Sequence, residues 1–296
     1  FAGWNTAANG SGTNYAASAT YTMPGANTSL YAKWTAATAT IAYAGNGSSA
    51  GSVPASTTAT AGSATTVSTN SGNLVNSGYS FAGWNTAANG SGTDYAAGAA
   101  INYPASGTTT LYAKWTANSY TLAYNSNGGS SAPGSTSQQF GSTVTVSSAS
   151  SNPTRAGYTF TGWNTSANGS GTSQAAGSTF SMPASNVTLY AQWTAINYNV
   201  TYSSNAPSGS TATGSQTDPA NYISGATVTV ANAGTLAVTS YRFVGWNTLA
   251  DGTGTDYAAG ASFTMPVGGI TLYAKWVLSS VKLTYDANGG SAGPMP

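Results

Sequence analysis

The sequence predicts a mostly β protein, built as an elongated tandem array of small antiparallel-sheet domains of about 80 residues each. Two observations predict this fold. Four segments that begin with Phe-x-Gly-Trp-Asn align almost without gaps along the 296 residues. Between them, short runs such as Thr-Val-Thr-Val alternate apolar and polar residues, which is the two-residue period of a half-buried strand.

Two Trp residues in each segment fix the period of the array. The first Trp recurs after 80, 79 and 83 residues, and the second after 81, 78 and 83. Because each Trp recurs at the same place in its repeat, we predict that all of them belong to the structural core: Trp4, Trp34, Trp84, Trp115, Trp163, Trp193, Trp246 and Trp276.

These landmarks divide the chain into one half repeat, three complete repeats and the start of another. The chain begins inside a repeat, so we expect a window on a longer array or a processed product. The predicted boundaries are 1–36 for the half repeat, 37–117, 118–195 and 196–278 for the complete repeats, and 279–296 for the final opening strand.

Each complete repeat opens with a strand in which apolar residues alternate, as in Leu122 and Tyr124. The Asn-Gly-Gly that follows Tyr124 and Tyr285 tolerates the positive φ angles of a tight turn. A short second strand comes next. Then Phe-x-Gly-Trp begins another strand, in which a Gly such as Gly83 predicts a β-bulge or a close backbone approach.

A polar Asn-Gly-Ser-Gly-Thr loop and a closing strand complete each repeat. The loop is rich in glycine but lacks the Lys and the following helix of a phosphate-binding site, so we interpret it as a simple connection. Met-Pro then marks the entry to the closing strand, because Pro cannot donate to a ladder. The closing strand, Thr-Leu-Tyr-Ala-Lys-Trp, ends with the second Trp on its apolar face.

The composition excludes most catalytic chemistry. With no His and no Cys, the chain lacks an imidazole base, a thiolate nucleophile and the usual zinc ligands. Six Lys and Arg against five acidic residues leave a net charge of +1 and no basic patch for nucleic acid. We therefore expect no enzyme, no cofactor, no metal, no nucleic-acid partner and no membrane insertion.

The combination Gly-Tyr-x-Phe-x-Gly-Trp-Asn, Asn-Gly-x-Gly-Thr-x-Tyr, Met-Pro and Thr-Leu-Tyr-Ala-x-Trp resembles the Listeria/Bacteroides repeat family, the internalin B-repeat. The match covers nearly the whole chain. The resemblance implies a small β-rich domain with a β-grasp-like sheet, found in tandem on secreted and surface proteins of microbes. It implies stalk or adhesion roles, an extracellular or cell-surface location and no catalytic residues.

Only 4% of the residues are charged, and so little charge favours association between chains. We therefore expect a non-enzymatic structural protein of an extracellular filament, sheath or surface layer, whose main partner is other copies of itself. One route is strand donation, in which the strand from Val281 to Asp286 completes the half repeat of a neighbour. The predicted assembly residues are Phe1, Leu283 and Tyr285.

Other interpretations stay open from the sequence alone. The array is an adhesin stalk or a carbohydrate-binding module in which aromatic rings stack on surface glycans. Asp251 and Asp256 resemble part of a calcium loop. Lysines of the closing strands suggest isopeptide crosslinks, and sequons suggest glycosylation. These positions are Lys33, Lys114 and Lys275, and Asn9, Asn89, Asn168 and Asn186.

Overall fold

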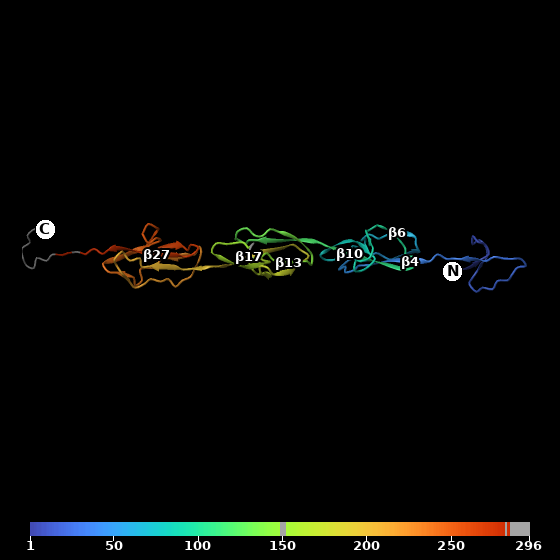
Figure 1. Cartoon of the computed structure of the whole chain (residues 1–296), viewed down its shortest axis with the longest axis horizontal. Coiled ribbons are helices and arrows are strands. Elements are labelled where there is room, and N and C mark those ends of the chain that lie inside the picture. The colour runs from blue at the N-terminus through green and yellow to red at the C-terminus, as the bar shows by residue number, and fades with distance from the viewer. Residues whose placement is uncertain (149–151, 282, 285–296) are drawn as a thin grey trace, which may run out of the picture. The chain divides into compact units, whose positions relative to one another are not determined.

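The protein is described from a computed structural model, which covers residues 1–148, 152–281 and 283–284. In these residues every regular element is a β-strand, so the predicted mostly β fold is confirmed (Figure 1). The chain divides into two compact units, with the division inside the predicted second complete repeat. The first unit is Phe1–Leu122, Thr136–Val144 and Phe180–Val187, and the second is Ala123–Ser135, Thr145–Thr179 and Thr188–Pro296.

The first unit contains the half repeat and the first complete repeat. In the half repeat, β1 lies between β2 and β3. The first complete repeat has a five-stranded sheet in the order β5-β4-β10-β7-β8, and β6 pairs separately with β9. The bounds are β1 Gly3–Asn5, β2 Asn14–Tyr15, β3 Tyr31–Lys33, β4 Thr38–Ala44, β5 Thr57–Thr60, β6 Ala64–Thr66, β7 Tyr79–Asn85, β8 Asp94–Tyr95, β9 Ala100–Asn102 and β10 Gly107–Ala117.

The second complete repeat has strands in both units. In the first unit β11 pairs with β12, and in the second unit β14 lies between β15 and β17. The bounds are β11 Ser119–Asn125, β12 Thr136–Gln139, β13 Thr143–Thr145, β14 Tyr158–Asn164, β15 Ser173–Gln174, β16 Thr179–Ser181 and β17 Val187–Ala195.

The third complete repeat lies entirely in the second unit. Its main sheet has the order β19-β27-β24-β23-β20, and β25 pairs with β24. Two further ladders join β18 to β21 and β22 to β26. The bounds are β18 Asn197–Tyr198, β19 Val200–Ser203, β20 Ala212–Thr213, β21 Tyr222–Ile223, β22 Thr227–Thr229, β23 Ala237–Val238, β24 Tyr241–Asn247, β25 Asp256–Tyr257, β26 Ser262–Thr264 and β27 Ile270–Leu278.

The opening and closing strands of a repeat run parallel to each other. Thr40 of β4 lies opposite Thr108 of β10, and Val200 of β19 lies opposite Ile270 of β27. The other pairings in these two repeats are antiparallel. The predicted antiparallel pairing holds for those ladders, and the opening and closing strands add one parallel pair to each sheet. A parallel pair needs a long crossover, and the rest of the repeat supplies it.

An aromatic cluster fills the core of each complete repeat. In the first, the Tyr43 and Trp84 rings are 4.7 Å apart between centroids, and Phe81 lies edge-on between Trp84 and Trp115. The Trp84 indole donates to the Ser68 carbonyl at 2.8 Å, and the Ser68 amide donates to the Tyr43 hydroxyl at 2.8 Å. One residue thus satisfies both buried polar atoms of the cluster.

The eight Trp residues occupy three kinds of position. Trp84, Trp163 and Trp246 are fully buried, whereas Trp115, Trp193 and Trp276 are half-buried at the edge of the core. In the half repeat, Trp4 is 40% exposed and Trp34 is 73% exposed, so these two are not core residues here. In the first complete repeat, by contrast, Tyr43 of the opening strand packs against the Trp84 ring.

The Gly before each buried Trp lies at a β-bulge, as the sequence predicts. The register between β7 and β10 shifts beside Gly83, whose φ is 126°. A methyl group added to Gly83 would lie 2.5 Å from the Tyr95 carbonyl oxygen. Glycine is needed here both for the backbone conformation and for the close approach of β8.

In the complete repeats that contain Met-Pro, the Met is a core residue and not only a marker of the strand entry, whereas Met23 of the half repeat is 70% exposed. Met182 and Met265 are each 1% exposed, and Tyr103 takes the same place in the first complete repeat. The Met182 amide donates to Ser142, and the Met182 carbonyl accepts from Gly141. The buried side chain and these backbone bonds hold the residue in place.

Truncation of a buried Trp should unfold its repeat at lower denaturant. We expect Trp163→Ala to reduce the free energy of unfolding by about 3 to 5 kcal/mol, because it removes a fully buried ring from the core. The control Trp34→Ala removes an exposed ring and should change it by less than about 0.5 kcal/mol. Urea unfolding followed by circular dichroism measures both, and equal effects would contradict the assignment of core and exposed positions.

A second comparison separates steric crowding from backbone conformation. Gly83 and Gly90 both have positive φ, but a methyl group at Gly90 would meet nothing within 4 Å. We therefore expect Gly83→Ala to destabilise the protein by about 1 to 3 kcal/mol more than Gly90→Ala, because only the former collides with a carbonyl. The same unfolding measurement tests this, and two equal losses would show that the Tyr95 approach is unimportant.

Candidate functional site

A polar loop closed by internal hydrogen bonds follows the first Trp of every copy. We call residues 85–95, with their equivalents 5–15, 164–174 and 247–257, the asparagine loop. In the first complete repeat it connects the end of β7 to β8. The Asn that begins each loop is buried, with exposed fractions of 1% to 2%, and it is the buried polar residue common to all four copies: Asn5, Asn85, Asn164 and Asn247.

The Asn85 side chain holds the loop closed from inside. Its amide nitrogen donates to the carbonyls of Gly90 and Gly92, at 3.3 and 3.1 Å, and to the Asp94 carboxylate at 2.6 Å. Its oxygen accepts from the amides of Ala87 and Gly92. A methyl group on Gly92 would lie 2.8 Å from that oxygen, so this second Gly is also required.

The direction of these backbone N–H groups argues against phosphate binding by the loop. A phosphate cradle needs backbone N–H groups that point at the ligand. Here the amides of Ala87 and Gly92 donate to Asn85 instead. The loop therefore satisfies its own backbone amides and leaves neither of these two for a phosphate. The Asn that accepts these bonds was not identified from the sequence. The signal was the invariable Asn after Gly-Trp in all four copies.

An ion pair extends the asparagine loop to the closing strand. Lys114 of β10 pairs with Asp94, and Lys275 of β27 contacts both carboxylate oxygens of Asp256 at 2.8 and 2.7 Å. The Lys hydrogen bond, followed by that of the Asn amide, holds the pKa of each Asp below its ordinary value. In the second complete repeat, the pair is replaced by Ser173 and Gln192.

This geometry also bears on the crosslink and calcium interpretations. Isopeptide formation requires a neutral amine and a protonated carboxyl group, whereas the lowered pKa keeps Asp94 ionised beside Lys114. Asp256 is engaged by Lys275, and Asp251 accepts from the Thr253 amide and hydroxyl at 3.0 and 2.7 Å. Among residues 1–148, 152–281 and 283–284, no three acidic, His or Cys side chains gather as a metal site.

The turn after each opening strand is tied to the asparagine loop. Asn127 and Gly128 have φ angles of 48° and 87°, as the Asn-Gly-Gly motif predicts. The Asn127 side chain then donates to the carbonyls of Ala167 in the loop and Ala191 in the closing strand, at 2.8 and 2.9 Å. Asn46 and Asn205 make the corresponding bonds in the other complete repeats. This Asn is thus a connector as well as a turn former.

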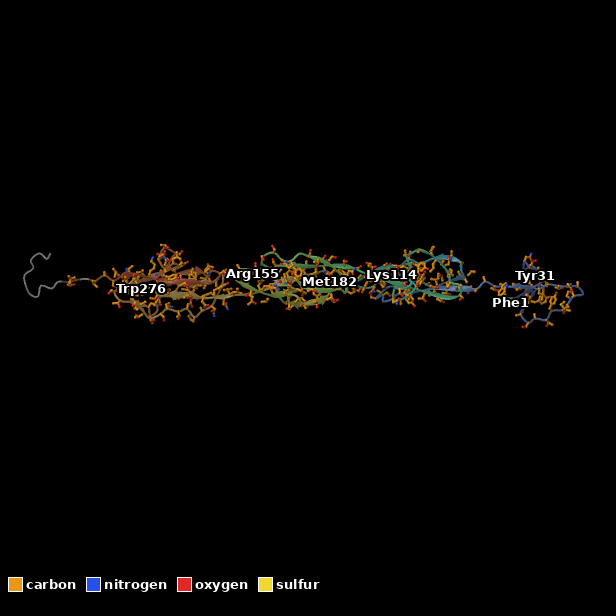
Figure 2. All side chains as sticks on the ribbon, viewed as in Figure 1. Phe1, Tyr31, Lys114, Arg155, Met182 and Trp276 are labelled. Carbon is orange, nitrogen blue, oxygen red and sulfur yellow. The ribbon has the colours of Figure 1, made fainter. Side chains whose placement is uncertain are left out.

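The predicted assembly residues lie at the surface or outside the described residues. Phe1 is 56% exposed and stacks edge-on with Trp4 and Trp34, at 5.2 and 5.7 Å. Figure 2 shows Phe1 and Tyr31 in the half repeat. Leu283 is 72% exposed and is not in a strand. Tyr285 lies outside the described residues, as do residues 282 and 286 of the predicted strand from Val281 to Asp286.

The sequons differ in their surroundings. Asn9, Asn89 and Asn168 lie at exposed loop tips, where each side-chain oxygen accepts from the Ser two residues later. The Asn186 oxygen instead accepts from the Thr121 amide at 2.8 Å.

The repeated sheet, aromatic core and asparagine loop define a tandem β-repeat protein. The chain belongs to the Listeria-Bacteroides repeat domain family, whose model matches residues 1–33, 40–114, 120–192 and 198–275. This confirms the resemblance seen in the sequence. Family members are typically non-catalytic and typical of surface proteins.

Two relatives come from Evansella cellulosilytica. A protein named "Putative Gly-rich membrane protein" is 30% identical over 297 residues, which cover 98% of this chain and 32% of the relative. A "Putative membrane protein" is 33% identical over 174 residues, covering 59% of this chain and 24% of the relative. The chain thus spans a third or less of the length of these relatives. In the described part of the chain, no helix has the length and apolar character to cross a bilayer.

The Lys–Asp pairs predict a specific pH dependence. Because folding lowers the pKa of Asp94 and Asp256, their stabilising effect is present at neutral pH and is lost as the pH falls through the ordinary Asp value of about 3.9 and below. We expect the quadruple variant D94S/K114Q/D256S/K275Q, which copies the second repeat, to lose less thermal stability between neutral and acid pH than the wild type.

Thermal unfolding at a series of pH values, at low salt, measures this difference. The control variant K33Q removes a closing-strand Lys that makes no ion pair among the described residues, and it should leave the pH profile unchanged. Superimposable pH profiles for the wild type and the quadruple variant would show that the pairs do not contribute.

Proposed function

We propose that this chain is a non-catalytic structural section of an extracellular or cell-surface protein, and that its tandem repeats build a filament, sheath or surface layer. The observation that carries the proposal is the repetition of one complete core with very short connections. The linker residue Asn118 donates to the Gly78 carbonyl at 2.9 Å and accepts from the Phe140 amide at 2.8 Å. A linker held by backbone hydrogen bonds on both sides resists bending, which suits an array that carries mechanical load.

The low surface charge supports association between copies. Of the 11 charged side chains (6 basic and 5 acidic), four neutralise each other in the Lys114–Asp94 and Lys275–Asp256 pairs. A surface with so little charge provides little electrostatic repulsion between neighbouring chains. Contacts between such surfaces would depend weakly on salt, because few ion pairs are available to be screened.

We propose that neighbouring chains are joined by strand donation from one copy to the next. In a complete repeat, Tyr43 on the opening strand packs against Trp84, beside the closing strand. The half repeat offers the equivalent Trp4 uncovered. The segment that starts at Val281 repeats the apolar alternation of the opening strands, and Val281 is 93% exposed. A strand of this pattern on another chain would add its backbone to β3 and its Tyr to Trp4.

A stalk that presents another domain is the second candidate. It is favoured by the printed names of the two relatives, which place both at a membrane, and by the small share of each relative that this chain covers. A stalk is expected to remain monomeric on dilution, whereas an assembly protein persists as multi-chain particles.

Sedimentation velocity over a dilution series tests the proposed joint. We expect multi-chain species that are insensitive to salt, and we expect Leu283→Asp to dissociate them because a donated strand would bury its carboxylate. Leu249→Asp, on an exposed loop of the third complete repeat, is the matched control and should have no effect. Monomers at all concentrations would refute assembly and favour the stalk, and electron microscopy of the native material would distinguish filaments from isolated particles.

A further inference from the structure

Equivalent clefts occur beside the closing strands of the first and third complete repeats. Each lies between the turn after the opening strand, the asparagine loop and the closing strand, and each has a volume of about 310 Å³. This is the lower end of the range for small-molecule sites, about 300 to 1,000 Å³. Lys114 of one cleft and Trp276 of the other are labelled in Figure 2. Corresponding residues line the two: Asn46 and Asn205, Ala88 and Ala250, Lys114 and Lys275, Trp115 and Trp276.

A fixed, half-buried indole lines each cleft. Trp115 donates to the Asn46 carbonyl at 3.0 Å, and Trp276 donates to the Ser204 carbonyl at 2.8 Å. Their inner edges pack on Phe81 and Phe243, at 5.8 Å between centroids in both repeats. These rings are therefore distinct from the fully buried Trp84 and its equivalents, whose role is confined to the core. A partly accessible indole that is fixed by a hydrogen bond and by a packed Phe ring is suited to stacking against a ligand ring.

The walls of the clefts are held in place before any ligand arrives. The Asn46 carboxamide bridges the carbonyls of Ala88 and Ala113, both at 2.9 Å, and so joins the loop to the closing strand. Asn205 joins Ala250 and Ala274 at 2.9 and 3.2 Å. Binding to such a site requires little ordering of the protein, which lowers its entropic cost.

The charge of the cleft selects the class of ligand. Its cation is neutralised by an Asp of the same repeat, as in Lys114 with Asp94, so an anionic polymer gains little. In the cleft of the first complete repeat the remaining polar lining groups are carboxamides, backbone carbonyls and an indole. The cleft of the third complete repeat also contains the Asp251 carboxylate and Ser208, which add no positive charge. Carboxamides and carbonyls match sugar hydroxyls, and the indole matches the apolar face of a pyranose ring. We propose that each of these two clefts binds one unit of a neutral polysaccharide.

The second complete repeat provides a natural comparison. There Gln192 replaces the Lys, and its amide nitrogen donates to the Ser166 carbonyl in the asparagine loop at 3.3 Å. A methyl group on Gly169 would lie 2.9 Å from the Gln192 side-chain oxygen, so this side chain covers the loop where the other repeats have their cleft. The second repeat is therefore expected to bind sugar weakly. The proposal does not depend on assembly, because both clefts are formed within single repeats.

Titration with neutral hexasaccharides tests the proposal, with cellohexaose, hexa-N-acetylchitohexaose and maltohexaose as probes. Tryptophan fluorescence and calorimetry on the full chain should show saturable binding of at least one, with about two sites per chain. A88L/A250L fills both clefts from exposed loop positions and should weaken binding at least tenfold. A167L makes the same change in the second repeat and should leave binding unchanged.

Each other outcome would overturn the proposal. Absence of binding to all three hexasaccharides, or equal binding by A88L/A250L and the wild type, excludes these clefts as the site. Binding of a heparin hexasaccharide in preference to the neutral probes would show that charge, and not stacking, governs recognition. Circular dichroism and thermal unfolding of the variants establish that any loss is not caused by misfolding. The state of assembly, measured in parallel, reports separately on the proposed structural function.

Discussion

Burial of one Trp at a glycine bulge is the constraint on which each repeat depends. The strands that carry Phe-x-Gly-Trp-Asn alternate regularly until the Gly and then bury three consecutive residues, a pattern shared by β7, β14 and β24. A regular strand cannot do this, because successive side chains point to opposite faces. The bulge turns Trp84 into the aromatic core and leaves Asn85 facing the loop. The core and the asparagine loop thus follow from the same local irregularity.

The buried polar groups of the first complete repeat are satisfied by short local bonds, most of which join uncharged groups. Ser68 serves both the Trp84 indole and the Tyr43 hydroxyl, and Asn85 serves the amides and carbonyls of its own loop. Burial raises the pKa of Tyr202, the equivalent of Tyr43, so this hydroxyl remains neutral at all ordinary pH values. A fold that needs no buried ions can discard almost all charged residues, which explains how 4% charge is compatible with a well-packed core.

Local signals in the sequence predicted the features that depend on neighbouring residues. The period of the repeat, the bulge at Gly83 and the positive φ angles at Asn127 and Gly128 all follow from short motifs. The parallel pairing of β4 with β10 does not follow from any short motif. An alternation pattern identifies a strand, but it does not indicate which distant strand pairs with it. The inward bonds of Asn85 were also missed, since they depend on where the loop backbone turns. The exposed Trp34 shows that recurrence alone does not imply burial when part of a repeat is absent.

Comparison of the copies separates what the fold requires from what the surface can vary. The first Trp, the Gly before it and the loop Asn are the same residue types in all four copies, whereas the Asp–Lys pair of two complete repeats becomes Ser173 and Gln192 in the other. Both members of the pair differ in the second complete repeat, where the Gln192 side chain donates to the Ser166 carbonyl of the asparagine loop. In the complete repeats the Lys is therefore present only where its Asp is, and the surface beside the closing strand differs in the second complete repeat. Differences between repeats therefore arise at the closing-strand surface, where a ligand or a neighbouring chain would meet them, while the core remains the same.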